Sequence, residues 1–366
     1  MVRVERDQVL AFRLARSGLA SRTAAGLAAA AACPASDFAR DAALLALAAR
    51  AEDVTRDDYD RAVDAGDVVV AHIVRGAIHA LDPGDLALYG RALLASDDDE
   101  LGAQLGRQVR RLGAEHGIAP GDALDEVAAA TEDALAGGEA FDKTALHAAL
   151  RARVRSELMP WCRSCGSHHV APMLWRFATI RAGARLDARR RYTLTRPGAA
   201  PAASEAVRRF LGFYGPAGPA DFAEWAGLAA PHARRLWDEV AGELTEVRAG
   251  RDAAWLLAAD AGALASPPQA RGTRLLPPGD PYLQKANRRL LAPEEALRKR
   301  LFRPVASPGA VLRDGRLVAL WRGRAKGGKL ELTVERLGRI ARADLEPEAE
   351  RVAAVRGAAG LALVLS

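Results

Sequence analysis

The stretch from Ser204 to Leu257 constrains the fold of this chain more than any other part of the sequence. Apolar residues recur there at three- and four-residue steps and are interrupted at Gly215-Pro216, which predicts three short helices in succession. Two extended runs joined by a turn follow between 244 and 257. Three helices and a hairpin in this order predict a winged helix, whose third helix would enter a DNA major groove. The residues expected to contact DNA near the start of that third helix are His232, Arg234 and Arg235. The alternative is that the stretch forms a small helical subdomain whose arginines are simply solvated.

A preceding part of the chain has the same layout, which predicts tandem winged helices. Its expected elements, three helices and a two-piece wing, are 122–136, 141–150, a helix from Ala171-Pro172, 185–186 and 192–194. The Pro/Ala-rich stretch 196–204 would link this unit to the next one.

The first hundred residues are predicted to be mostly helical. The expected helices are 6–16, 24–32, 39–50 and 55–63. The nearly all-apolar stretch 68–81 follows and is expected to be extended, as the wing of a first unit. Four consecutive acids, 97–100, predict a surface loop.

After Ser266-Pro267-Pro268 the pattern changes to alternating strands. Turns at Asp314-Gly315 and at 326–329 predict antiparallel pairing, and the apolar tail 358–365 predicts a final strand or helix docked on this sheet. The predicted fold class is therefore mainly α with β: tandem winged-helix domains plus a C-terminal small β-barrel or sheet domain. The expected domains are 1–118 (helical and winged-helix), 119–198 (winged helix with a Cys/His insertion), 199–264 (winged helix) and 265–366 (basic and β-rich).

Composition argues against a membrane-spanning, a secreted or a disulfide-rich protein. The chain has 366 residues, enough for two to four compact units. No apolar run reaches the roughly 20 residues needed to span a bilayer, and residues 1–6 lack the apolar segment of a secretory signal. Three cysteines do not form a disulfide framework, so a reducing cytoplasm is the expected location.

Positive charge is concentrated near the C-terminus. The net charge is +6, but between Arg271 and Arg342 eighteen Lys/Arg face six Asp/Glu, a local balance of +12 that leaves −6 elsewhere. A basic region on a slightly acidic body predicts that a polyanion binds in one place. The turn 326–329 combines two cations with two glycines, which suits a DNA groove, although a solvated charged turn is the alternative. The candidate DNA contacts of this region are Arg288, Arg289, Arg322, Arg324, Lys326 and Lys329.

Four short motifs stand out along the chain, namely Leu44–Leu47, Val74–His79, Asp280-Pro281-Tyr282, and Arg303-Pro304 with Asp314-Gly315. With these motifs the chain resembles the winged-helix DNA-binding family that includes the AlkZ-like DNA glycosylases, over almost its whole length. The resemblance implies a monomer of three tandem winged helices plus a β-barrel, which form a concave, positively charged channel for duplex DNA.

The second of these motifs contains two further candidate DNA contacts. Arg75 before Gly76 suits a phosphate contact at a backbone turn, and a surface ion pair is the alternative. His79 lies in an apolar stretch, where a structural histidine is expected and DNA contact is the alternative; His72 is similar.

The resemblance also implies where chemistry would occur. In the enzymes of the family a Gln-x-Gln motif, or a variant with Asp or His, follows the second N-terminal helix and helps to place the hydrolytic water. Here that position holds Pro34-Ala35-Ser36, in which proline has no donor and serine is too short to orient a water. Asp37 follows, and a carboxylate can stabilise a glycosyl cation and activate water. The alternative is that Asp37 caps a helix beginning near Phe38.

A Cys-x-x-Cys motif followed by two histidines is the sharpest local pattern. Cys162 and Cys165 can both reach one Zn²⁺, and His168 and His169 would complete four ligands. Structural zinc sites usually draw the second pair of ligands from a distant segment, so the alternative is a tight connector whose histidines face solvent or DNA. Cys33 has no cysteine neighbour and is expected to be buried.

Together these patterns predict a monomeric, cytoplasmic protein that binds double-stranded DNA and reads its shape and backbone more than its sequence. Damaged bases are the candidate targets. No cofactor is required, zinc is the candidate metal, and no membrane partner is expected. One alternative is an active glycosylase that excises alkylated bases with Asp37 placing the water. Another is a winged-helix transcriptional regulator, a class that usually dimerises on paired half-sites.

Overall fold

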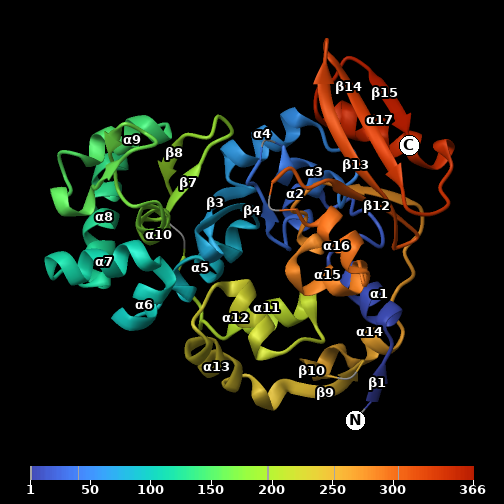
Figure 1. The fold of residues 1–366 in the computed structure, drawn as a ribbon, viewed down its shortest axis with the longest axis horizontal. Helices are drawn as coiled ribbons and strands as arrows, with labels where there is room; N and C mark the ends of the chain where they lie inside the picture. The colour runs from blue at the N-terminus through green and yellow to red at the C-terminus, as the bar shows by residue number, and fades with distance from the viewer. Residues whose placement is uncertain (1, 40, 196–197, 251, 304) are drawn as a thin grey trace. The chain divides into compact units, whose positions relative to one another are not determined.

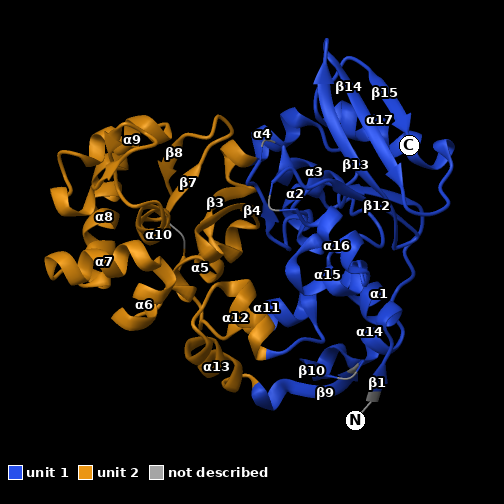
Figure 2. Ribbon diagram, viewed as in Figure 1, with its two compact units in different colours: residues 1–62, 208–218, 241–366 blue, residues 63–207, 219–240 orange. Residues whose placement is uncertain are grey.

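The structure, a computed structural model, describes residues 2–39, 41–195, 198–250, 252–303 and 305–366 (Figure 1). Several predicted features include positions outside the described residues, among them the helix 39–50, the Arg303-Pro304 motif, the turn 249–252 and the linker 196–204. The chain forms two compact units (Figure 2). Unit 1 comprises Met1–Ala62, Arg208–Gly218 and Ala241–Ser366, and unit 2 comprises Val63–Val207 and Pro219–Val240. Both combine separated stretches of chain, and the finer division into four consecutive domains stays a prediction.

Four helices near the N-terminus form where they were predicted. They are α1 (Arg6–Arg16), α2 (Gly26–Ala30), α3 (Ala42–Ala48) and α4 (Arg56–Ala65). α1 has the predicted ends and buries Val9, Phe12 and Leu14 on its inner side. Thr55 starts α4 with a reciprocal cap: its hydroxyl accepts from the amide of Asp58, and the Asp58 carboxylate accepts from the amide of Thr55, both at 3.1 Å.

A five-stranded sheet in unit 1 forms the predicted C-terminal β region (Figure 1). Its strands lie in the order β11 (Thr273–Leu276), β12 (Gly309–Arg313), β13 (Arg316–Lys326), β14 (Lys329–Arg336) and β15 (Leu361–Leu365). All neighbours are antiparallel except β14 and β15, which are parallel. Both predicted turns form, at Asp314-Gly315 and Gly327-Gly328, with positive φ at all four residues as in type I′ turns. The tail is a strand of this sheet, and closure of the sheet into a barrel stays a prediction.

Helices also occur in this C-terminal region, where the sequence pattern did not indicate them. They are α14 (Ala261–Ala265), α15 (Lys285–Leu291), α16 (Glu295–Leu301) and α17 (Arg342–Val355). The first three are too short to show a clear helical period. α17 contains Pro347, a residue that usually interrupts a helix, yet it packs against β11, β14 and β15.

The stretch 204–257 folds into the predicted succession of elements. They are α11 (Glu205–Tyr214), α12 (Pro219–Ala226), α13 (Ala230–Asp238), β9 (Leu244–Ala249) and β10 (Asp252–Leu257). In unit 1, β9 and β10 pair antiparallel, and β1 (Val2–Val4) adds a third, parallel strand beside β9. The sequence did not predict β1, because three residues are too few to establish a period.

Unit 2 contains the other predicted set of three helices and a hairpin. These elements are α8 (Pro120–Leu135), α9 (Lys143–Leu150), α10 (Pro172–Ala182), β7 (Ala184–Leu186) and β8 (Tyr192–Leu194). α8 packs against both α9 and α10, and β7 pairs antiparallel with β8. The predicted extended stretch is the hairpin of β3 (Val69–Ile73) and β4 (Ala77–Leu81). Because β3 also pairs with β7, the strands β4, β3, β7 and β8 lie side by side in that order.

The acidic run 97–100 begins a helix, so the prediction of a loop there was wrong. Asp97 caps α6 (Asp98–Leu105), and its carboxylate accepts hydrogen bonds from the amides of Asp99 and Glu100. Three acids then occupy the first turn, where the positive end of the helix dipole favours them. A run of acids therefore signals a helix start as well as a loop. The flanking helices are α5 (Leu86–Tyr89) and α7 (Arg107–His116).

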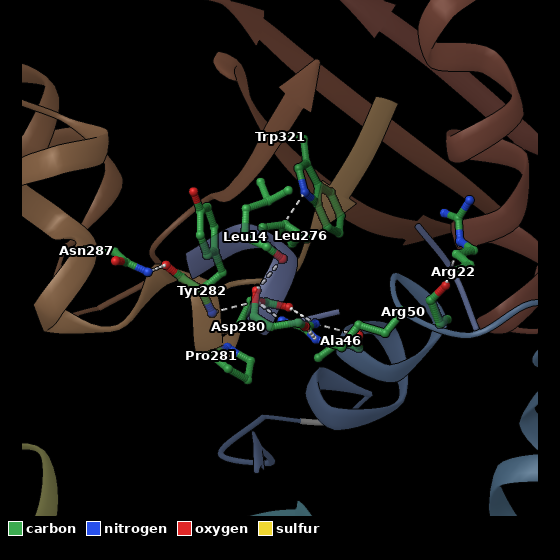
Figure 3. A network of polar contacts seen from close by, with 12 residues as sticks. Leu14, Arg22, Ala46, Arg50, Leu276, Asp280, Pro281, Tyr282, Asn287 and Trp321 are labelled. Atoms are coloured by element: carbon green, nitrogen blue, oxygen red, sulfur yellow. Dashed lines mark hydrogen bonds and ion pairs between the residues drawn. The ribbon is translucent and has the colours of Figure 1, made fainter. Parts of the chain in front are cut away.

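A fully buried ion pair joins two distant parts of unit 1 (Figure 3). Arg50 donates to both carboxylate oxygens of Asp280 at 2.8 Å, and the two side chains are 2% and 0% exposed. Arg50 also donates to the carbonyl oxygens of Ser17 and Ala46, and Asp280 accepts from the amide of Tyr282. A buried ion pair is tolerated when its remaining donors and acceptors are satisfied in this way.

Removing one partner of this pair is expected to destabilise unit 1 strongly. Asp280→Ala leaves the guanidinium of Arg50 buried without a counter-charge, so the free energy of unfolding should fall by about 3–5 kcal/mol in urea titrations. Glu295→Ala is the matched control, because it breaks an exposed pair with Lys299 and should cost less than about 1 kcal/mol. Equal losses in the two variants would contradict the role assigned to the buried pair.

Candidate nucleic-acid interface

The hairpin β13–β14 presents four of the predicted DNA contacts to solvent. Arg322, Arg324 and Lys326 occupy alternate positions of β13, so their side chains lie on one face of the hairpin. Lys329 pairs with Lys326 across the tip, and all four residues are exposed. Arg322 donates to the carbonyl oxygen of Ala306 at 2.6 Å, but none of the four makes an ion pair with a described residue. Their charges are therefore available to a polyanion.

The other face of β13 carries Gly323, beside the side chain of Arg356. A Cβ at Gly323 would lie 2.6 Å from a guanidinium nitrogen of Arg356, so a larger residue there would displace the end of that side chain. The guanidinium of Arg356 in turn lies over the ring of Trp321, 5.8 Å from its centre. The charged face of the hairpin is open to solvent from Arg322 to Lys326.

The two predicted contacts on α15 differ in accessibility. Arg289 is exposed. Arg288 is half-buried, and its guanidinium carbon lies 4.7 Å from the centre of the Phe302 ring. This cation–π contact holds Arg288 against the protein, so Arg289 is the more accessible of the two.

The cations at the start of α13 face acidic side chains within unit 2. Arg235 donates to Glu100 at 2.7 Å, and Nδ1 of His232 lies 3.4 Å from the same carboxylate. Arg234 pairs with Asp238 one turn further along the helix, at 2.8 Å. The hydrogen bond from Arg235 is the main cause of the lowered pKa of Glu100, and burial lowers the pKa of His232. Carboxylates therefore already neutralise part of the positive charge at the start of α13.

Arg75 lies at the tip of the β3–β4 hairpin in the left-handed conformation. Its φ is 59° and that of Gly76 is 63°, so the turn predicted at Arg75-Gly76 is confirmed. The half-buried side chain packs over Gly227, where an added Cβ would lie 2.5 Å from Cγ of Arg75. Packing of this kind holds a residue in a disfavoured backbone conformation and fixes its position. A phosphate contact by Arg75 stays a prediction.

The two histidines of this hairpin are buried and neutral. Nδ1 of His72 donates to the hydroxyl of Thr179 at 2.8 Å, since that hydroxyl itself donates to the carbonyl oxygen of Arg176. Nδ1 of His79 donates to the carbonyl oxygen of Ala77 at 3.0 Å. Burial lowers the pKa of His72 to about 3 and that of His79 to about 4. The surroundings of His72 and of His79 fit the expectation that these histidines are structural. Contact between His79 and DNA stays a prediction.

Asp37, the predicted catalytic carboxylate, follows β2 (Ala35–Ser36) in unit 1 and is 5% exposed. Its Oδ1 accepts a hydrogen bond from the amide of Ala43 at 3.4 Å, in the first turn of α3. Asp37 thus satisfies one first-turn amide of α3, although the N-cap residue of this helix is Asp41 and the helix begins at Ala42, not near Phe38 as expected. Phe38 is 63% exposed, so an aromatic ring lies open to solvent directly beside the buried carboxylate.

A small cavity that no sequence pattern indicated lies beside Cys33 in unit 1. It has a volume of about 130 Å³, and its polar lining includes Ser17, Ser21, Thr23 and Arg50. Burial raises the pKa of Cys33 to about 12, which keeps its thiol protonated at neutral pH. The described lining residues include no carboxylate and no histidine, so the cavity by itself supplies no general base.

Three of the four predicted metal ligands converge in unit 2. The sulfur atoms of Cys162 and Cys165 and a ring nitrogen of His169 all lie within 4.8 Å of one another. The strands β5 (Trp161–Cys162) and β6 (Ser167–His168) pair on either side of the Cys-x-x-Cys turn. His168 does not join the cluster, because its Nδ1 donates to the carbonyl oxygen of Met159 at 2.9 Å.

Hydrogen bonds to the Cys162 sulfur favour the thiolate. The hydroxyl of Ser164 lies 3.1 Å from this sulfur and is the main cause that lowers the pKa of Cys162 to about 6. The amide of Cys165 acts in the same direction. The thiolate is the form of cysteine that binds metals.

Comparison with known proteins identifies relatives along the whole chain. A family model described as DNA glycosylase AlkZ-like matches residues 13–355. An interstrand DNA cross-link repair glycosylase of Streptomyces sahachiroi is 33% identical over 126 residues, which are 33% of this chain and 34% of that relative. The aligned part thus spans about a third of the relative's length. The solved structure of Streptomyces sahachiroi DNA glycosylase AlkZ is similar over 100% of both chains, with a TM-score of 0.78 and 23% identity, and this likeness shows a shared fold.

Within the described residues, none of the helices combines the length and the apolar character that crossing a bilayer requires.

Lowering the pH is expected to destabilise unit 2 through its two buried histidines. An unfolded histidine titrates near 6.5, whereas folded His72 and His79 stay neutral down to about 3 and 4. Their contribution to stability is therefore complete above pH 6.5 and lost below it, by roughly 1.4 kcal/mol per pH unit for each histidine. In urea titrations between pH 7 and 5, His72→Gln should show a shallower loss than the wild type. The exposed His116→Gln serves as control and should keep the wild-type slope, whereas an unchanged slope in His72→Gln would contradict a neutral, buried His72.

Proposed function

The chain belongs to the AlkZ-like DNA glycosylase family, and on that premise we propose that it binds double-stranded DNA by its phosphate backbone in DNA repair. The observation that carries this proposal is the row of exposed cations on the β13–β14 hairpin, Arg322, Arg324, Lys326 and Lys329. Neutralisation of phosphates supplies most of the affinity in nonspecific DNA binding and needs several free cations on one surface.

The spacing of this row suits a phosphate backbone. Alternate residues of a strand are about 6.6–6.8 Å apart, so Arg322, Arg324 and Lys326 extend over about 13 Å. That length corresponds to the axial rise of about four nucleotides on one DNA strand. The small tip, Gly327-Gly328, adds no bulk that would keep the hairpin away from a groove.

Recognition of shape and backbone is favoured over recognition of bases. Base recognition by a winged helix relies on free side chains near the start of its third helix. In α13 these side chains are held by acids, since Arg235 and His232 face Glu100 and Arg234 pairs with Asp238. We therefore propose that the two predicted winged helices position the protein on the duplex and do not read its bases. They comprise α8–α10 with β7–β8, and α11–α13 with β9–β10.

The salt dependence of binding tests the role of the hairpin. The triple variant Arg322→Gln/Arg324→Gln/Lys326→Gln removes three phosphate contacts, so the slope of log K against log salt should become shallower by about 2.7. Fluorescence anisotropy of a labelled duplex between 50 and 300 mM KCl measures this slope in the full-length protein.

A second triple variant controls for net charge. Arg61→Gln/Arg111→Gln/Arg153→Gln removes the same charge from exposed arginines that already pair with Asp or Glu, and it should leave the slope nearly unchanged. An equal change in both variants, or binding of the wild type that ignores salt, would reject the proposal. A preference of more than about a thousandfold for one DNA sequence would favour the transcriptional regulator instead.

Base excision with Asp37 is the second candidate function. Asp37 is a buried carboxylate that directly follows Pro34-Ala35-Ser36, the position of the catalytic motif in the family, and the exposed ring of Phe38 beside it could stack on a base. A carboxylate at this point suits the activation of water beside an oxocarbenium-like centre. The capping bond to Ala43 supports this role, because it holds the carboxylate in one position.

The variant Asp37→Asn separates catalysis from capping. Asparagine caps a helix as well as aspartate does, so the thermal stability should change little, but the general base is lost. If Asp37 places the water, release of modified bases from alkylated duplexes should fall by about 100-fold or more. Asp37→Ala should lose both activity and about 1 kcal/mol of stability. Absence of base release by the wild type across a panel of lesions would reject excision and leave DNA binding in place.

A further inference from the structure

We propose that Cys162, Cys165 and His169 form a zinc site in unit 2 that fixes the chain where it enters α10. Their three ligand atoms lie within 4.8 Å of one another, although no ligand bond holds them together. The site belongs to the connection between α9 and α10, and its ligands are not among the residues assigned to DNA binding. Metal binding at this site can be tested without reference to the proposed function.

The backbone of this connection brings the two sulfur atoms together. The Cys-x-x-Cys turn closes with a hydrogen bond from the amide of Gly166 to the carbonyl oxygen of Cys162 at 2.9 Å. Gly166 has a φ of 59°, a conformation that glycine adopts without strain, and it returns the chain into β6. Cys162 then pairs with Ser167 across the hairpin, which leaves both thiols on the turn.

Strand geometry selects which histidine joins the cysteines. Successive side chains of an extended chain point to opposite sides, so His168 and His169 diverge. The ring of His168 packs against Trp161, with 5.2 Å between the ring centres, and bonds to Met159. His169 is directed to the other side, toward the cysteines.

The hydrogen bonds of His169 prepare it as a metal ligand. Its Nδ1 lies 2.8 Å from the carbonyl oxygen of Val170, an acceptor, so Nδ1 carries the proton and Nε2 keeps its lone pair. Nε2 is buried and has no hydrogen-bond partner among the described residues. A backbone carbonyl that orients a histidine through one ring nitrogen while the other binds a metal is the usual arrangement in zinc sites. A metal ion would supply the partner that Nε2 lacks.

The donor set selects zinc among the common metals. Two thiolates and an imidazole are soft or borderline ligands, which suit Zn²⁺ and exclude the oxygen-seeking Mg²⁺ and Ca²⁺. With bond lengths of about 2.0–2.3 Å, a tetrahedral ion holds its ligand atoms roughly 3.5–3.8 Å apart, so closure of the site requires side-chain shifts of about 1 Å. Among the described residues no fourth ligand side chain belongs to the cluster, so a water molecule would complete the tetrahedron around a bound ion.

Metal content and cobalt spectra of the full-length protein test the site. Protein purified with its thiols reduced should carry about one zinc per chain by mass spectrometry of the metal. Replacement with Co²⁺ should give a thiolate-to-metal charge-transfer band in the near ultraviolet and intense visible bands typical of tetrahedral coordination. Zinc should also raise the melting temperature of the metal-free protein by several degrees, because it binds only the folded site.

Variants distinguish this site from a redox pair and from adventitious binding. Cys162→Ser, Cys165→Ser and His169→Gln should each weaken zinc binding at least tenfold, whereas His168→Gln, the neighbouring histidine outside the cluster, should bind normally. A Cys162–Cys165 disulfide that forms in the presence of zinc would overturn the proposal, as would equal losses in His168→Gln and His169→Gln. Should a ligand variant fail to fold, the wild-type cobalt spectrum decides, because absence of the charge-transfer band rules out thiolate ligation.

Discussion

The buried Arg50–Asp280 pair is the interaction on which the organisation of unit 1 depends. It joins residues 230 positions apart in the chain and removes both charges from water, a cost that only a nearly complete set of hydrogen bonds can offset. The polar network continues around it, since Trp321 donates to the carbonyl oxygen of Leu276 (Figure 3). The hydroxyl of Tyr282 donates to the carbonyl oxygen of Leu10. Apolar side chains of α1, the segment 276–301 and the sheet pack into one core beside this network. The N-terminal helices and the C-terminal sheet are thus parts of a single structure.

The charged hairpin extends from that core. A Cβ at Gly309 would lie 2.2 Å from Nε1 of Trp321 and 2.4 Å from the carbonyl oxygen of Leu276, so glycine is required for the bond between these two groups. Trp321 anchors β13 at this point, and from Arg322 onward the strand is exposed. A rigid base and a solvated, cationic end are what a protein needs to hold a phosphate backbone without reading bases.

Two buried histidines of unit 2 are held in their uncharged form. His72 and His79 lie inside the sheet as neutral donors, and His169 directs an unprotonated nitrogen toward two cysteine sulfur atoms. Neutral groups with satisfied hydrogen bonds cost far less to bury than charges, so His72 and His79 need no buried counter-charge of the kind that Arg50 has in Asp280.

Local signals in the sequence determined many of the helices, several turns and the family of this protein, although they missed α6 and α14 to α17. The cap at Thr55 and the turn at Gly327-Gly328 were predictable, because caps and turns depend on residues within four positions of one another. The motif position 34–36, which Asp37 follows, and the Cys-x-x-Cys spacing were equally visible in the sequence. Tertiary structure alone decided that Arg50 meets Asp280, that Arg235 is held by Glu100, and that His169 and not His168 faces the cysteines. These outcomes depend on the three-dimensional path of the backbone, which brings distant residues together and sets the side toward which each side chain points, and no local period encodes that path.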